Sequence, residues 1–440
     1  MAEKSDGAAI ASQPTPALRD ATRVWARIGI LSFGGPAAQI ALMHRMVVDE
    51  RRWLSERQFL DALSFCMLLP GPEAMQLATF AGWRMHGVRG GLLAGGLFVL
   101  PGAILIAALA ALYGRYGDLA LVAALFTGIK AAVLVIVVQA LVRLSRRALR
   151  GPEAVALAGL AFLALFVFAV PYPAVVALAA VWGALRLAAP ANTASDSGDA
   201  PRGAEVTATL RRVALWLAVW LLPLAAIGLV APPIFAELAR FFATLATVSF
   251  GGAYAVLAYM AQEAVTGRGW LTAGEMLDAL GLAETTPGPL ILVTEFVGYL
   301  ASARAALVPE HALWWGLAGA IVTLWATFAP CFLWIFAGAP WIDILSRRRR
   351  LAAALAGVAA AVVGVIANLS VWFALHVLFT ELATLRAGPA RLLLPAPATL
   401  DPVATGIAVA VAVALFALRW PVAAGIALGA GLGAAAHVLI

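Results

Sequence analysis

The hydrophobic pattern divides the chain into long apolar runs separated by short polar segments. Spanning the hydrocarbon core takes about 20 consecutive apolar residues, and runs of that length give thirteen candidate segments. They begin near residues 24, 59, 90, 119, 153, 172, 213, 236, 276, 313, 351, 402 and 420. Each is expected to be a helix, because lipid offers no hydrogen bonds to an open backbone. The pattern predicts an all-α polytopic membrane protein with about 13 transmembrane segments.

Composition supports lipid as the main solvent. The 440 residues are 63% hydrophobic and 12% charged, whereas a globular chain carries about 25% charged residues. A secreted or cytosolic enzyme is therefore excluded. The net charge of +7 does not indicate a nucleic-acid partner, because the cations lie between apolar runs rather than in one patch. Cys66 and Cys331 lie inside apolar runs without metal-ligand spacing, so no disulfide framework, metal or other cofactor is expected.

Polar stretches divide the chain into units. Residues 1–20 lack the apolar region of a cleavable signal and are expected to form a disordered cytoplasmic arm. Residues 190–212, rich in Pro, Gly, Ser, Thr and Asp, are expected to be a cytoplasmic linker. A first unit, 21–189, precedes this linker. An extra transmembrane helix, 213–231, and a second unit, 232–440, follow it.

The two units are copies of each other. A shift of 217 residues matches 18 of 41 positions between 32–72 and 249–289 without a gap. The matches include Ser-Phe-Gly-Gly, Trp-Leu, Leu-Asp-Ala-Leu and Pro-Gly-Pro, whose order chance similarity of apolar residues does not explain. A later block matches at an offset of 229, where Pro101 meets Pro330, Gly128 meets Gly357 and Gln139 meets Asn368.

The number of segments predicts that the two copies are inverted. Six segments and one extra helix precede the second copy, so it enters the membrane upside down, as in many secondary transporters. Arginine-rich loops then lie inside, with the N-terminus cytoplasmic and the C-terminus periplasmic. The arginines of these loops are Arg143, Arg146, Arg147, Arg150, Arg211, Arg212 and Arg347 to Arg350. The loop with Arg45, Arg51, Arg52 and Arg57 lies outside if the first two segments cross, and inside if both are re-entrant; both alternatives stay open.

The Pro-Gly-Pro motifs must break their helices, because proline lacks an N–H and clashes with the preceding turn. With Gly71 as cap and Pro72 at the first helical position, free N–H groups on Glu73 and Ala74 favour an anion. Pro70 precedes them. The second copy repeats the motif with two hydroxyls before it: Thr285, Thr286, Pro287, Gly288 and Pro289. We expect both breaks to line one cavity near the midplane; the alternative is a packing kink.

Paired glycines and aspartates accompany these breaks. Gly34 and Gly35, with Gly251 and Gly252 in the second copy, either let helices approach closely or open the backbone toward a ligand. Asp61 and Asp278 follow Trp-Leu in each copy and are expected to begin helices as caps or N-terminal charges.

Lys130 lies at the centre of an apolar segment and is one of two lysines against 28 arginines. A charge there costs about 3 kcal/mol on insertion scales. Its compact ammonium is a candidate counter-charge for an anion; the alternative is an ion pair with a buried carboxylate such as Glu73.

Further polar residues lie inside apolar runs. Gln139 and Asn368 are expected to make interhelical hydrogen bonds or to line a polar cavity. Glu284 and Glu295 flank the second break, where either one could carry a proton or line a polar face. Glu73 belongs to the same candidate polar cavity.

The motifs of both copies resemble those of the CHR chromate transporters in their long two-domain form. The first copy carries the resemblance in FGGPAAQIALMHR (33–45), RRWLSERQFLDALSFCMLLPGPEAMQLATFAGW (51–83) and GLLAGGLFVLPGAILI (91–106). The second copy carries it in SFGGAYAVLAYM followed by WLTAGEMLDALGLAETTPGP, and coverage extends over 20–440. The resemblance implies chromate export across the bacterial cytoplasmic membrane and chromate resistance, driven by the proton motive force or anion exchange. One position departs from this resemblance: the family pattern implies an acidic residue where this chain has Met46, whereas the second copy has Glu263 at the equivalent position.

The sequence leaves other functions open. Chromate and sulfate share charge and shape, so only the resemblance favours chromate over sulfate or another oxyanion, and a channel remains an alternative to a carrier. A membrane-embedded enzyme would need a nucleophile, a metal set or a base with an orienting partner. HExxH, Ser-His-Asp order and a Walker loop are lacking, so no enzyme is expected. Protons or a counter-anion are the expected partners besides lipid, and a homodimer is left open.

Overall fold

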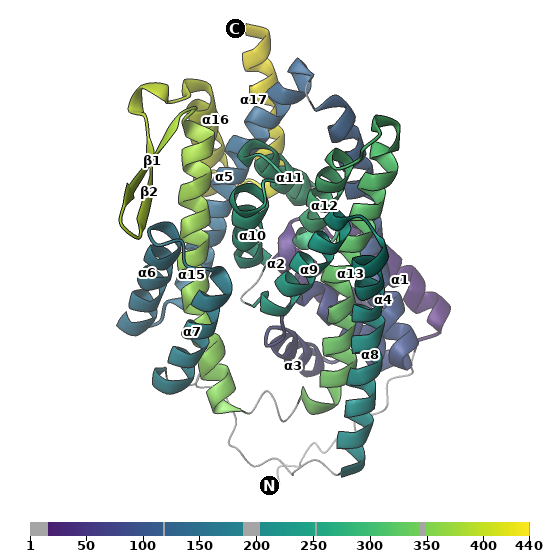
Figure 1. The fold of residues 1–440 in the computed structure, drawn as a ribbon. Coiled ribbons are helices and arrows are strands. Elements are labelled where there is room, and N and C mark those ends of the chain that lie inside the picture. Colours follow the sequence, from purple (N-terminus) through teal and green to yellow (C-terminus); the bar gives the residue numbers. More distant parts are fainter. Residues whose placement is uncertain (1–15, 118, 188–202, 251–252, 343–347, 440) are drawn as a thin grey trace, which may run out of the picture.

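The computed structural model describes residues 16–117, 119–187, 203–250, 253–342 and 348–439 (Figure 1). The expected all-α architecture is confirmed, because nearly every regular element in these ranges is a helix. The exception is one antiparallel hairpin, β1 (Leu382–Ala387) and β2 (Ala390–Pro395). The hydropathy pattern did not predict this hairpin.

The helices of the second copy follow the order of the first. The first copy contains α1 (Leu18–Leu31), α2 (Gly35–His44), the π-helix η1 (Arg45–Glu50), α3 (Glu56–Cys66), α4 (Glu73–Tyr116), α5 (Ala120–Ala148), α6 (Pro152–Phe166) and α7 (Tyr172–Arg186). After α8 (Gly203–Val230), the second copy contains α9 (Pro233–Val248), α10 (Ala253–Gln262), η2 (Glu263–Gly267), α11 (Ala273–Thr285), η3 (Leu290–Leu292), α12 (Val293–Arg304), η4 (Pro309–His311), α13 (Ala312–Gly338), η5 (Ala339–Trp341), α15 (Arg349–Leu378), β1, β2, η6 (Pro397–Thr399), α16 (Pro402–Ala412), η7 (Val413–Ala417) and α17 (Val422–Leu439).

Two expected boundaries differ from the observed ones. Helix α1 begins at Leu18, inside the segment expected to be disordered, because its buried face already includes Ala21 and Val24. Helix α8 begins at Gly203, inside the expected linker, since the proline and glycine signals end there. Residues 1–15 and 188–202 lie outside the described part of the chain.

Helix α4 consists of two helices joined by a sharp turn. Its backbone leaves the helical region at His86 (φ −135°) and at Gly87 (φ 62°, ψ −151°). A Cβ at Gly82 would collide with the carbonyl of Gly90, and one at Gly95 with the Thr79 hydroxyl. These contacts show that 73–85 and 88–116 pack antiparallel, so the first part is a short half-helix.

Helix length separates two kinds of element. In the described part of the chain, six helices are long and apolar enough to cross a membrane: Glu73–Tyr116, Ala120–Ala148, Val206–Val230, Pro309–Trp341, Arg349–Leu378 and Val422–Leu439. The candidates near residues 24, 59, 236 and 276 correspond to α1, α3, α9 and α11, of 14, 11, 16 and 13 residues. Each is shorter than the roughly 20 residues of a full crossing. They are half-helices: α3 and α11 end before the predicted Pro-Gly-Pro breaks, and α1 and α9 end before the Ser-Phe-Gly-Gly segments.

The two copies exchange their last helices. Helix α17 packs on α5, and α7 packs on α15. Gly128 of α5 touches Gly429 of α17, and Gly357 of α15 touches Gly183 of α7, so closely that a Cβ would strike backbone. Gly128 and Gly357 are the pair that the offset of 229 aligns. The reciprocal contacts relate the copies by an approximate twofold arrangement.

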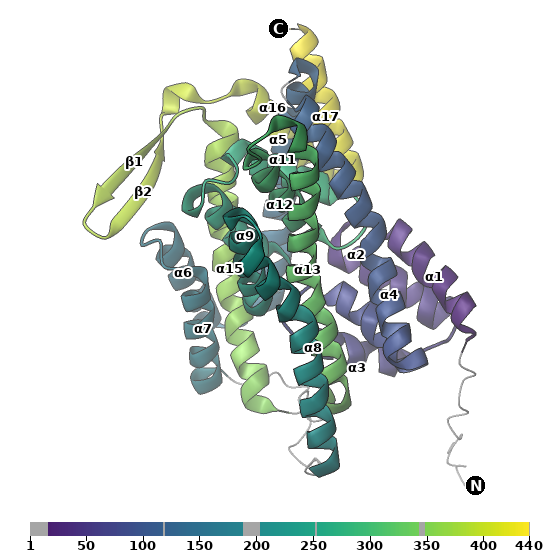
Figure 2. The ribbon, with the colours of Figure 1, turned by 45° about the vertical axis from the view of Figure 1, so that its right-hand side comes forward.

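The corresponding helices run in opposite directions. Gly433 of α17 contacts Ala124 while Gly429 contacts Gly128, so α17 is antiparallel to α5. Helix α5 therefore begins at the end of the molecule where α17 terminates. Helix α15 begins at the opposite end, the end at which α8 also begins (Figures 1 and 2). This confirms the expected inversion of the two halves.

Candidate functional site

Both Pro-Gly-Pro motifs break their helices where the sequence predicts. Helix α3 ends at Cys66 before α4 begins, and α11 ends at Thr285 before η3 begins. Gly71 (φ 118°) and Gly288 (φ 95°) have a backbone that only glycine adopts without strain. The cap of α4 is Pro72 rather than Gly71, because Pro72 is extended (φ −72°, ψ 107°) and the first helical residue is Glu73.

Each break is bonded to the Ser-Phe-Gly-Gly segment of the other copy. The Gly71 N–H donates to the Ser249 carbonyl at 3.0 Å, and the Gly288 N–H donates to the Ser32 carbonyl at 2.9 Å. The four residues are equivalent in pairs under the 217-residue shift. We call this set, Ser32, Gly71, Ser249 and Gly288, the crossing. These hydrogen bonds join each break to the opposite segment rather than break to break.

Two buried glutamines at the crossing were missed by the sequence analysis. The Gln39 amide donates to the carbonyls of Ser32 (3.2 Å) and Gly288 (2.6 Å), and the Gln76 amide donates to Pro70 (2.6 Å). Each glutamine Oε1 is buried without a partner among the described residues. Their equivalents in the second copy are Val256 and Val293, so the repeat gave no signal for them. A buried polar atom without a partner marks a place where water or a ligand would bind.

The glycine pair of the first copy keeps the backbone open. Gly34 and Gly35 have φ values of 87° and 76°, and a Cβ at Gly35 would meet nothing within 4 Å. Close helix packing therefore does not explain Gly35. Gly251 and Gly252 lie outside the described residues.

Lys130 is held by an aspartate of the other copy. Its Nζ lies 3.3 Å from Asp278 Oδ1, and the Tyr113 hydroxyl donates to Asp278 Oδ2 at 2.7 Å. Asp278 is 3% exposed. The three residues come from α5, α11 and the second part of α4. The carboxylate partner of Lys130 is thus Asp278 rather than Glu73, for which no ion pair is observed within the described ranges.

The predicted capping role of the two aspartates is wrong. The N-cap of α3 is Ser55 with Gln58 completing a capping box, and the N-cap of α11 is Thr272 with Glu275. Ser or Thr followed three residues later by Gln or Glu is the stronger helix-start signal. Asp278 lies inside α11, which leaves its carboxylate free to contact Lys130.

Lys130 lines a cavity of about 600 Å³ near the C-terminal end of α15. Three of its lining residues are threonines, namely Thr127, Thr272 and Thr380. Its lining residues are Thr127, Lys130, Thr272, Ala273, Gly274, His376, Val377, Phe379, Thr380, Leu382, Asp401 and Ala404. None belongs to a Pro-Gly-Pro motif. Helix α11 nevertheless connects the two places, since it begins at this cavity and ends at the second break, roughly 20 Å away at 1.5 Å per residue.

The remaining predicted side chains make few contacts. The Tyr254 hydroxyl donates to Glu284 Oε1 at 2.8 Å. The hydroxyls of Thr285, the last residue of α11, and Thr286, which follows it, donate to carbonyls of α11. Gln139 and Asn368 are half-buried, and the expected interhelical hydrogen bonds are not observed for their side chains within the described ranges.

Comparisons with known proteins agree over both copies. The sequence profile described as Chromate transporter matches residues 20–184 and 236–434. The chain is 35% identical over 352 residues to the chromate transport protein of Pseudomonas aeruginosa, covering 77% of each chain. It is 28% identical over 367 residues to the probable chromate transport protein of Synechococcus elongatus, covering 81% of this chain and 84% of the relative. No solved structure is significantly similar.

Proposed function

Because the chain belongs to the chromate transporter family, we propose that it is a secondary transporter that exports chromate across the bacterial cytoplasmic membrane and confers chromate resistance. The proton motive force or anion exchange supplies the energy. The observation that carries this proposal is the crossing, where inverted copies contact each other reciprocally through broken helices. Broken helices at the interface of inverted repeats are where secondary transporters bind substrate and alternate access.

Lys130 supplies the counter-charge for the anion. A dianion entering a dry site loses its hydration, and each helix N-terminus returns only about half a charge. No Pro-Gly-Pro residue lines the Lys130 cavity, so the breaks and Lys130 act on the anion at successive points of the pathway. In its own cavity Lys130 provides the positive charge when the anion displaces Asp278, 3.3 Å away, and the threonine residues of the cavity help to solvate the oxyanion.

The breaks and glycine pairs form the rest of the pathway. Oriented N–H groups at the start of α4 have no side-chain cap and suit an anion. The substrate-contacting set is Gly34, Gly35, Pro70, Gly71, Pro72, Gly251, Gly252, Thr285, Thr286, Pro287, Gly288 and Pro289, and the polar or coupling set is Glu73, Gln139, Glu284 and Asn368.

The N-terminus and the arginine-rich loops face the cytoplasm, and the C-terminus faces the periplasm. Helix α8, which contains Arg211 and Arg212, and helix α15, which begins at Arg349 directly after Arg348, both start at one end of the molecule (Figure 1). Cysteines at Ser197 and Ser346, on a background lacking Cys66 and Cys331, should resist an impermeant thiol reagent in intact cells. Labelling at either position contradicts this orientation.

Uptake of labelled chromate and sulfate into everted membrane vesicles, with and without a proton gradient, tests the proposed function. Sulfate is included because the same cavity suits either dianion. Saturable chromate uptake that responds to the gradient or to a counter-anion supports a chromate carrier. Sulfate uptake without chromate uptake would contradict the proposed substrate. An anion current that depends on neither a proton gradient nor a counter-anion would indicate a channel.

A further inference from the structure

Few charges are shared between the two copies. When the 217-residue shift is extended to align 16–72 with 233–289, four positions carry a charge of the same sign in both copies. The four pairs are Asp20 with Glu237, Arg23 with Arg240, Arg51 with Arg268, and Asp61 with Asp278. Asp278 holds Lys130. The other three pairs have no role in the site described above.

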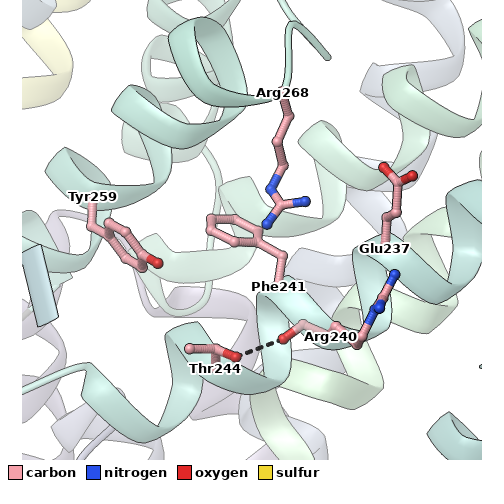
Figure 3. A pocket seen from close by; sticks show the side chains of 6 residues that line it. All are labelled: Glu237, Arg240, Phe241, Thr244, Tyr259 and Arg268. Carbon is pink, nitrogen blue, oxygen red and sulfur yellow. Dashed lines mark hydrogen bonds between the residues drawn. The ribbon is translucent and has the colours of Figure 1, made fainter. Parts of the chain in front are cut away.

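In the second copy these three charges gather around one cavity. The cavity has a volume of about 370 Å³ and is lined by Glu237, Arg240, Phe241, Thr244, Tyr259 and Arg268. Figure 3 shows Arg268 pointing from above into the space beside Phe241, with Glu237 and Arg240 on the same helix opposite. Residues far apart in the chain, from α9, α10 and the segment after η2, thus form one polar site.

The Arg268 guanidinium is held in place by aromatic rings. Its central carbon lies 5.0 Å from the ring centroid of Phe241 and 5.1 Å from that of Trp270, distances at which a cation is attracted to a ring face. Its Nε lies 3.7 Å from Glu263 Oε2, and no other ion pair of this guanidinium is observed in the described part of the chain, so its two terminal nitrogens remain for another ligand. The side chain is 33% exposed. Arg268 is therefore both positioned and reachable.

Arg240 offers a second guanidinium. It is exposed, and it makes no ion pair within 4 Å among the residues described. Two guanidinium groups present planar sets of donors that match tetrahedral oxyanions. Glu237 and Glu263 oppose tight binding of an anion, so the site suits brief capture. The volume leaves room for an oxyanion with part of its water shell, since a water occupies about 30 Å³.

The first copy carries the three equivalent residues. Asp20 and Arg23 pair at 3.7 Å at the start of α1, and Arg51 follows η1. Because the copies are inverted, equivalent groups face opposite ends of the molecule. The duplication has therefore kept the same two arginines and one acid at both ends.

We propose that the cavity of Arg240 and Arg268 captures a hydrated tetrahedral dianion at one mouth of the pathway, and that Arg23 and Arg51 form the matching capture site at the other mouth. This goes beyond the Lys130 site, and it rests on the proposed function for the identity of the anion. Capture at the mouths raises the local concentration of a dianion before it loses its water shell.

The test measures initial uptake of labelled chromate, and of labelled sulfate as a second probe, in right-side-out and everted vesicles. Arg240→Gln and Arg268→Gln should raise the half-saturation concentration about three- to tenfold at one face only, with a near-parental maximal rate. Arg51→Gln should do so at the other face. Arg57→Gln is the matched control, since Arg57 is 93% exposed and its counterpart is Gly274; it should change neither face.

Two results would overturn the capture sites: an unchanged half-saturation concentration in Arg240→Gln, Arg268→Gln and Arg51→Gln, or an increase at the same membrane face in all three. Arg268→Lys should recover part of the affinity that Arg268→Gln loses, because it restores the charge without the planar donors. If the guanidinium only anchors the helix, membrane abundance falls while the half-saturation concentration stays constant, which refutes the proposal. A parent protein that takes up sulfate but no chromate, with the same face-specific shifts, would refute the proposed substrate and leave the capture sites supported.

Discussion

Replacement of Lys130 separates its charge from its role in packing. If Lys130 had no partner, Lys130→Ala would ease membrane insertion by removing a costly charge. The contact with Asp278 reverses this expectation, because the variant leaves a carboxylate that is 3% exposed with Tyr113 as its one remaining polar partner among the described residues. The single variant should therefore be less stable than the parent.

The magnitude follows from the geometry. Two unit charges 3.3 Å apart attract by about 5 kcal/mol at an effective dielectric constant of about 20. Much of this attraction offsets desolvation. Removing one partner of a buried pair typically costs about 3 to 5 kcal/mol, because the other charge is left uncompensated. Lys130→Ala should thus lower the unfolding temperature by several degrees, whereas Lys130→Ala with Asp278→Asn should restore most of it.

The assay combines unfolding of the purified protein in detergent with chromate uptake in vesicles. We expect the double variant to be close to the parent in stability and to have almost no uptake, because the counter-charge is missing. Lys130→Arg with native Asp278 tests the shape of the cation, since a guanidinium is broader than an ammonium. Parental uptake by the stable double variant would refute the counter-charge role and leave Lys130 as a structural partner of Asp278.

Three further predictions follow from the structure. Gly288→Leu should abolish uptake while protein remains in the membrane, because φ is 95° and a Cβ would lie 2.9 Å from the Leu292 side chain; Gly159→Leu, with nothing within 4 Å, is the control. Gly128→Leu should instead reduce membrane abundance, measured by immunoblot, since its Cβ strikes the α17 backbone; parental abundance would contradict that contact. The hydrogen bond with Glu56 raises the pKa of His44 above 6.5 and outweighs burial, which lowers it. The stabilisation that this pKa shift represents is therefore fully present below pH 6.5 and is lost as the pH rises through the pKa of the folded state. The destabilisation by Glu56→Gln should accordingly be larger at pH 5.5 than at pH 8.5 in thermal unfolding, and an equal effect at both would contradict it.

The breaks and their register were predictable because proline and glycine impose backbone requirements. Gly71 and Gly288 both need a positive φ, and the same 217-residue shift that aligns them also relates the hydrogen bonds of the crossing. Gly128 and Gly357 were aligned from sequence, and they make equivalent close contacts. A residue that the backbone conformation or a close helix contact requires is therefore the same in both copies, and aligning the copies reveals it.

Contacts between the copies were not predictable in the same way. Lys130 meets Asp278 through packing of α5 on α11, and no local pattern encodes that approach. A hydropathy pattern records how apolar a segment is but not whether the chain reverses its direction within it. The turn at Gly87 inside α4 was therefore not predicted. Gln39 has an apolar counterpart and lies in an apolar helix, which gave it no signal.

Counterflow in proteoliposomes tests the central claim most directly, because only a carrier that alternates between two faces exchanges bound substrate. Liposomes with the purified protein are loaded with unlabelled chromate and diluted into a trace of labelled chromate. We predict a transient accumulation of label inside, above its external concentration, and its absence with the Lys130→Ala, Asp278→Asn variant. Label that only equilibrates, or that never enters liposomes containing the parent protein, would contradict a chromate carrier built from two inverted copies.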